Sequence, residues 1–318
     1  MLTASGPSSG YWVGRSCHEF ECGGCSAEAT RRDLAVTIWT DLSGLSFQTR
    51  YVQVGGWSTR VLEHGSGEPI IFLHGTGGHL EAFLRNRGAL GGRYRVVLYD
   101  LPGHGWSTLT TYDLEIADYE EHLLGLMTVL GIERAHLSGE SLGGWVAVKF
   151  AAKHADRVVS LILNTPGGTM ADPGVMDRIT TLSQAAADDP TAERIRSRLE
   201  WLMADASTVT DELVAIRQSI YARAGFSRSM RHILCLQDAE IRRRNLIDDA
   251  EFAAITAPTL IIWTSDDPSG PAHAGLRMAE AIDGAEFQLI EGAGHWPQWE
   301  QRERFDKVIA EFLSRVVT

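Results

Sequence analysis

The chain has 318 residues, of which 44% are apolar and 22% are charged, the balance of an ordinary globular protein. Its formal net charge is −12, whereas surfaces that bind nucleic acid are basic, so a nucleic-acid partner is not expected. No apolar run approaches the roughly 18 residues that span a bilayer, and the first residues lack the apolar core of a secretory signal. These features predict a cytoplasmic protein without a membrane partner.

Residues 1–45 are rich in Gly and Ser, show no periodicity and predict a flexible N-terminal extension. The segment carries three cysteines, Cys17, Cys22 and Cys25, with His18 beside the first. A zinc site is the alternative interpretation. Structural zinc sites usually pair two C-x-x-C hooks, however, and only the spacing from Cys22 to Cys25 matches one. We therefore expect no metal.

From residue 46 the pattern is regular. Phe47–Val54 and Ser58–Glu63 flank a Gly-Gly pair, which predicts a hairpin. Continuous apolar runs of four to six residues predict strands buried on both faces of a parallel sheet. These runs are Pro69–Leu73, Arg95–Tyr99, Ala135–Ser138, Val158–Leu163, Thr259–Trp263 and Phe287–Ile290. Helical patterns such as Leu114–Leu130 alternate with them, so the fold class is α/β with a doubly wound, mostly parallel sheet.

Residues 172–249 break this alternation, because they show helical patterns and no convincing strand. The segment is too long for a loop in a compact domain. We interpret it as a helical cap inserted over the carboxyl edge of the sheet, where active sites of α/β proteins lie. The core is then divided into residues 46–171 and 250–318.

The motif with the clearest chemistry is Gly139-Glu-Ser-Leu-Gly-Gly144, which follows a predicted strand and opens a predicted helix. A G-x-S-x-G sequence in this context forms a sharp turn that exposes a nucleophilic serine, here Ser141. The turn requires small neighbours, which Gly139 and Gly143 supply. The alternative is a plain turn between a strand and a helix.

A serine hydroxyl needs a positioned base, and a carboxylate orients that base. Enzymes with this turn have serine, acid and histidine in that order along the chain. His295 lies in a Gly-rich loop after the last predicted strand and is the candidate base. For the other histidines after Ser141, solvated or structural roles are favoured; these are His154, His232 and His273. The acid is expected after the strand Thr259–Trp263, where Asp266 and Asp267 are adjacent, and only one can reach the imidazole.

The reaction also needs two backbone donors for a developing oxyanion. The N–H of Leu142, directly after the nucleophile, is one candidate. The loop His74-Gly-Thr-Gly-Gly-His79 provides the other, with Thr76 favoured and Gly77 next. Gly75, in the same loop, is expected to contact the substrate. A phosphate-binding P-loop is excluded because no Gly-Lys-Ser/Thr follows.

Residues 47–318 resemble the α/β-hydrolase superfamily. Within it, Gly294-His-Trp-Pro-Gln-Trp-Glu300 closely resembles the segment around the catalytic histidine of meta-cleavage product hydrolases. These enzymes cut a carbon–carbon bond in 2-hydroxy-6-oxo-hexa-2,4-dienoates, which arise from ring opening of catechols. Phe83–Asn86 and Thr210–Arg217 also look similar.

The resemblance implies particular site residues. Family loops place the acid four residues before a proline, and Pro271 then selects Asp267 over Asp266. Arg217 matches an arginine that contacts the dienoate, and Trp296 matches a tryptophan beside the substrate. Their ordinary interpretations are a solvated helix residue and a core aromatic.

The chain also departs from the family pattern. The family usually has asparagine where this chain has Glu140, and a further asparagine where it has Ala82. The glycine content of its oxyanion loop is also lower than usual.

The predicted function is cofactor-free hydrolysis of a carbon–carbon bond in a 2-hydroxy-6-oxo-dienoate by a Ser-His-Asp triad. An esterase or lactonase with the same triad is the enzymatic alternative, and a binding protein on an inactive hydrolase scaffold is the remote one. The expected partner is a small-molecule substrate, and a homo-oligomer is left open.

Overall fold

The computed structural model describes residues 37–86, 90 and 92–316. The possible zinc ligands of the N-terminal extension lie outside the described residues; these are Cys17, His18, Cys22 and Cys25. In the part of the chain that the structure describes, no helix is long and apolar enough to cross a bilayer.

The end of the predicted extension forms a short helix, α1 (Ile38–Leu42), in place of the expected flexible segment. Thr37 caps the helix, because its side chain accepts a hydrogen bond from the Thr40 N–H. Ile38 and Leu42 are each 5% exposed and belong to the apolar core. Five residues are too few to show a helical period, which is why the pattern gave no signal. The predicted extension therefore reaches too far at its C-terminal end.

Eight strands form one sheet in the order β1-β2-β4-β3-β5-β6-β7-β8. The contacts β1–β2 and β2–β4 are antiparallel, and the others are parallel. The strands are β1 (Phe47–Val54), β2 (Trp57–His64), β3 (Glu68–Leu73), β4 (Tyr94–Tyr99), β5 (Ala135–Glu140), β6 (Val158–Asn164), β7 (Thr259–Thr264) and β8 (Glu286–Ile290). This arrangement confirms the predicted fold class, and every predicted strand is present with its ends within two residues.

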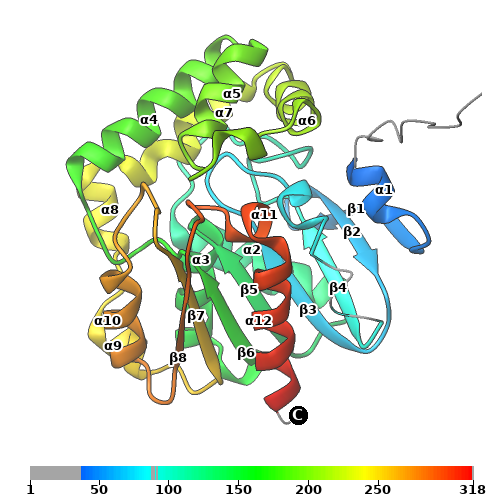
Figure 1. Cartoon of the computed structure of the whole chain (residues 1–318), viewed down its shortest axis with the longest axis vertical. Coiled ribbons are helices and arrows are strands. Elements are labelled where there is room, and N and C mark those ends of the chain that lie inside the picture. The colour runs from blue at the N-terminus through cyan, green and yellow to red at the C-terminus, as the bar shows by residue number, and fades with distance from the viewer. Residues whose placement is uncertain (1–36, 87–89, 91, 317–318) are drawn as a thin grey trace, which may run out of the picture. The chain divides into compact units, whose positions relative to one another are not determined.

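Helices cover both faces of the sheet, which explains the continuous apolar runs: all residues of β5 and β7 are buried. One apolar core joins the sheet to α2 (Ile116–Val129), α3 (Leu142–Lys153), α9 (Asp249–Ala253) and α10 (His273–Ala281). The core on the other face includes α12 (Arg302–Arg315), which Figure 1 shows in red in front of the strands. Shorter elements are η1 (Leu80–Phe83), η3 (Ala155–Arg157) and α11 (Pro297–Glu300).

Between β6 and β7, residues 172–249 are all described and contain helices but no strand. The helices are α4 (Pro173–Asp188), α5 (Ala192–Glu200), η4 (Ala206–Thr208), α6 (Asp211–Tyr221), α7 (Phe226–Ile233), η5 (Leu234–Gln237) and α8 (Ala239–Asn245), followed by the start of α9. Figure 1 shows α4 to α7 gathered at one end of the sheet, in green to yellow. This end is where β5 passes into α3, so the cap covers the turn that carries Ser141.

Candidate active site

Ser141 occupies the turn between β5 and α3, with a positive φ of 53° and ψ of −114°. A Cβ at Gly139 would lie 2.3 Å from the Gly143 carbonyl oxygen, and one at Gly143 would lie 2.2 Å from that of Leu73. No side chain fits at either position: Gly139 lets β5 pack against the start of α3, and Gly143 lets α3 pack against β3. The motif thus has the strained strand–turn–helix geometry that presents a serine at the edge of a sheet.

His295 lies in the loop between β8 and α11, and its Nδ1 is 2.9 Å from Asp267 Oδ1. The Asp267 side chain is fully buried in the loop after β7. Asp266 points elsewhere: it is exposed, and its carboxylate accepts a hydrogen bond from the Ser265 hydroxyl at 2.6 Å. Of the two adjacent acids, the structure brings Asp267 to the imidazole.

Ser269 is a further member of this group that sequence reasoning missed. Its hydroxyl donates to Asp267 Oδ1 at 2.7 Å and lies 3.1 Å from His295 Nδ1. Its backbone N–H also donates to Asp267 Oδ1, at 2.8 Å. These bonds fix the carboxylate that orients the imidazole. The only sequence signal is a serine two residues after the acid, which is common in turns.

Glu140 occupies the opposite side of the imidazole. Its Oε1 is 3.3 Å from His295 Nε2, and its Oε2 accepts the Gly75 N–H at 2.6 Å. The residue is only 1% exposed. Within the described residues no hydrogen bond joins Ser141 Oγ to His295. Catalytic hydrogen bonds of this kind often form only when the substrate binds. The departure noted at Glu140 thus places a second carboxylate in direct contact with the base.

The two carboxylates affect the protonation of the histidine. Burial lowers the pKa of His295, but Asp267 and Glu140 outweigh burial, so its pKa is raised overall. Burial raises the pKa of Glu140, and the nearby His295 offsets only part of this effect. The imidazole therefore holds a proton more tightly than a free histidine does.

The loop after β3 contains Thr76 and Gly77, the two candidates for the second oxyanion donor. Two cavities adjoin Ser141, and Thr76 lines both of them. Gly77 instead faces the cap, because its carbonyl accepts a hydrogen bond from the Tyr221 hydroxyl at 2.9 Å. Leu142 is the first residue of α3, where backbone N–H groups lack helical partners. Thr76 and Leu142 thus both line the larger cavity with Ser141, and their role as the pair of oxyanion donors stays a prediction.

His74 braces this loop. It is buried, lies 2.9 Å through Nδ1 from the Gly75 carbonyl, and accepts the Leu101 N–H at Nε2. Burial lowers the pKa of His74 to about 3, so the ring is neutral and donates from Nδ1.

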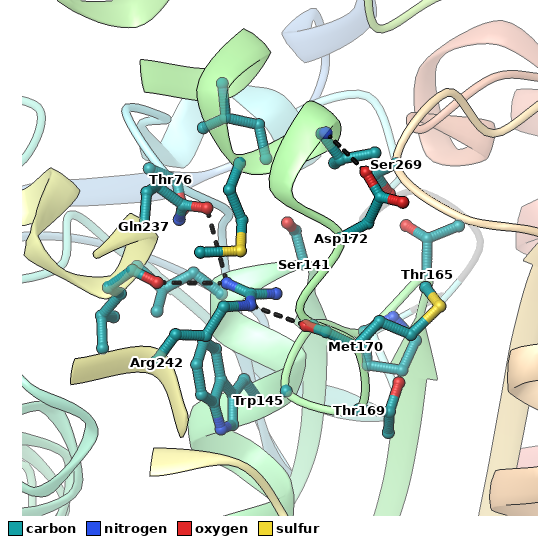
Figure 2. A pocket seen from close by; sticks show the side chains of 18 of the residues that line it. Thr76, Ser141, Trp145, Thr165, Thr169, Met170, Asp172, Gln237, Arg242 and Ser269 are labelled. Atoms are coloured by element: carbon teal, nitrogen blue, oxygen red, sulfur yellow. Dashed lines mark hydrogen bonds between the residues drawn. The ribbon is translucent and has the colours of Figure 1, made fainter. Parts of the chain in front are cut away.

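Two cavities meet at Ser141 and His295, both of which line each of them. The larger has about 620 Å³ of empty space and reaches Trp145, Met170 and Arg242 (Figure 2). The smaller has about 350 Å³ and includes the predicted residues Gly75 and Trp296. A molecule bound across the serine would therefore have one part in each cavity.

Two arginines of the cap are buried near the smaller cavity. Arg217, on α6, is 1% exposed and lies 5.2 Å from the centre of the Trp296 ring. Its Nε and Nη2 have no hydrogen-bond partner among the described residues. Arg198, on α5, lines the cavity and is 3% exposed; its Nε donates to Ser183, but its Nη1 has no partner there. Arg217 is thus an enclosed cation and not a solvated helix residue. Arg198 is a second buried cation at the site, and no sequence motif predicts it.

The sequence model of the protein family described as "Alpha/beta hydrolase family" matches residues 70–308 of the chain. The chain belongs to this family. It is 35% identical to a 2-hydroxy-6-oxononadienedioate/2-hydroxy-6-oxononatrienedioate hydrolase from Paraburkholderia phymatum, over 84% of this chain and 96% of that protein. It is 32% identical to a 2-hydroxy-6-oxo-6-phenylhexa-2,4-dienoate hydrolase from Comamonas testosteroni, over 80% of this chain and 90% of that protein.

A solved structure gives the same grouping. The meta-cleavage product hydrolase CumD from Pseudomonas fluorescens IP01 is 28% identical, with a TM-score of 0.74 over 84% of this chain and 98% of that one. The resemblance predicted from the motifs around Ser141 and His295 is therefore confirmed across most of the chain.

Proposed function

We propose that the protein hydrolyses a carbon–carbon bond in 2-hydroxy-6-oxo-hexa-2,4-dienoates. The observation that carries this proposal is the enclosed guanidinium of Arg217, whose Nε and Nη2 have no acceptor among the described residues. Buried polar groups are normally hydrogen-bonded, and a planar carboxylate matches the fork of an arginine. The dienoate carboxylate, bound beside Trp296, would supply the missing acceptor. The relatives from Paraburkholderia phymatum and Comamonas testosteroni are named as hydrolases of dienoates of this type.

The reaction assigns one role to each group. His295, oriented by Asp267, takes the proton of the 2-hydroxyl and delivers a proton to C5 as the dienol converts to its keto form, so the imidazole is neutral again for the next step. Ser141, or water that it activates, then attacks the C6 carbonyl, and the N–H groups of Thr76 and Leu142 stabilise the oxyanion. The C5–C6 bond breaks, and water is added overall, giving a five-carbon dienoate and a carboxylic acid. No cofactor is required, and we place the reaction in the cytoplasm.

The test is a spectrophotometric assay of several yellow dienoates beside p-nitrophenyl esters. We expect dienoate turnover, and we expect Ser141→Ala to reduce it by about a thousandfold or more, the usual loss for a member of a catalytic triad. Ser314→Ala, at an exposed position of α12, is the matched control and should leave the rate unchanged. Ester hydrolysis without dienoate turnover would replace this proposal with the esterase alternative.

A further inference from the structure

The larger cavity holds a charged group that the proposed reaction does not use. The cavity extends from Ser141 away from Glu140 and Trp296, so it would receive the substituent at C6 of a bound dienoate. Much of its lining is apolar or aromatic, including Trp145, Met176 and Ile179. Arg242, on α8, lines the same cavity, and Figure 2 shows its guanidinium between Trp145 and Ser141.

Arg242 is held in place by neutral groups. Its Nε donates to the Met170 carbonyl at 2.6 Å, and its Nη1 donates to the Leu236 carbonyl at 3.2 Å. The guanidinium carbon lies 5.0 Å from the centre of the Trp145 ring, a cation–π contact. Within the described residues no hydrogen bond is made by Nη2, which leaves one edge of the guanidinium open to the cavity.

No carboxylate of the described residues neutralises this charge. Burial alone lowers the pKa of Arg242, to about 10, so the side chain remains a cation at neutral pH. Among the lining residues the one carboxylate is Asp172, which is exposed and accepts the Val175 N–H at the start of α4. A partly desolvated cation without a counterion is unfavourable, and an anionic ligand would stabilise it.

We propose that Arg242 binds an acidic group on the C6 substituent, so that the preferred substrate is a dienoate with a second carboxylate at its far end. This inference rests on the proposed function, which supplies the orientation of the substrate across Ser141. Arg242 then binds the far carboxylate in the larger cavity, and the first carboxylate lies in the smaller cavity beside Trp296, whose ring is in contact with Arg217. A neutral aromatic substituent would instead leave the open edge of Arg242 without an acceptor.

The experiment compares kcat/KM for 2-hydroxy-6-oxonona-2,4-dienedioate and 2-hydroxy-6-oxo-6-phenylhexa-2,4-dienoate. We expect the wild type to prefer the dioate. Arg242→Gln should lower kcat/KM for the dioate about 10- to 150-fold, mainly through KM, the ratio that corresponds to a charge-assisted bond of about 1.5–3 kcal/mol. The phenyl substrate should change less than about threefold. Arg243→Gln, at the next, exposed position of the same helix, is the matched control and should change neither.

A second variant separates substrate binding from structure, because Arg242 also holds two carbonyls of the cavity wall. Arg242→Lys keeps the charge but loses the fork, so it should retain part of the preference for the dioate. An equal loss on both substrates in both variants would show that Arg242 only supports the wall, and would overturn the inference. So would a wild type that prefers the phenyl substrate.

Failure of the proposed function gives a different pattern. In that case the wild type turns over neither dienoate, and the comparison is repeated with mono-p-nitrophenyl succinate and p-nitrophenyl butyrate. If the wild type prefers the acidic ester and Arg242→Gln abolishes this preference, the anion site is supported although the proposed carbon–carbon bond hydrolysis is refuted. Absence of any preference that depends on Arg242 would overturn the anion site.

Discussion

At the scale of single residues, the imidazole of His295 lies between two carboxylates, Asp267 at Nδ1 and Glu140 at Nε2. Arg198 opposes them and lowers the pKa of His295, and Arg217 lowers that of Glu140. The general base must be neutral to accept a proton. The negative charge of Glu140 stabilises the imidazolium, so it keeps His295 protonated, and inactive as a base, up to a higher pH. Glu140 also accepts the Gly75 N–H and so positions the oxyanion loop.

This balance gives a prediction with a definite sign. Glu140→Gln removes a negative charge that favours the imidazolium, so the pKa of His295 should fall and the acid limb of the kcat/KM profile should move to lower pH. The amide oxygen of glutamine still accepts the Gly75 N–H, which preserves the loop. The profile is measured against Glu280→Gln, an exposed position on α10 that should behave as wild type. An acid limb that stays in place or moves to higher pH would contradict the assignment.

The adjacent acids after β7 provide a second test. Asp267→Asn should lower kcat by about a thousandfold or more, because an amide at this position lets the imidazole adopt the wrong tautomer. Asp266→Asn is the matched control, and its effect should be small because its side chain is exposed and bonded to Ser265. Single-turnover measurements on both variants decide the matter, and a reversed ranking would refute the role given to Asp267.

Residues in local motifs could be predicted from the sequence, but contacts across the chain could not. Ser141 and His295 each lie beside glycines in a loop or turn that follows a strand, and the close packing of these turns requires the glycines. Ser269 and Arg198 have no such pattern. The departure at Glu140 was visible in the motif, but its contact with His295 depends on how loops far apart in the sequence meet.

At the scale of elements, strands were predictable because burial on both faces leaves a continuous apolar run, as in β5 and β7. The cap could be predicted only as a helical interruption. Its contact with the histidine loop is tertiary: the His295 N–H donates to the Leu202 carbonyl at 2.6 Å, and Glu300 accepts both the Gly294 and Ala204 N–H groups. Because the cap end and the catalytic loop share these bonds, the cap helps to position the base.

At the scale of the whole molecule, α1 connects the start of the described chain to both the core and the cap. Ile38 and Leu42 belong to the apolar cluster that includes Leu80 of η1 and Leu213 of α6. The Ile38 N–H also donates to Glu212 Oε2 of α6 at 2.8 Å, across 174 residues of sequence. The helix therefore joins the cap to the sheet side of the molecule.

The last prediction tests this connection. Replacing both Ile38 and Leu42 with alanine removes buried apolar groups from that cluster, so we expect the free energy of unfolding to fall by roughly 2–4 kcal/mol. This loss is below the sum for two central core sites, because residues near a chain end can relax into the space. Urea unfolding followed by tryptophan fluorescence measures it. Gln48→Ala, at an exposed position of β1, is the control and should change stability by less than about 0.5 kcal/mol. A double variant as stable as this control would show that α1 adds nothing to the fold and that the extension does reach residue 45.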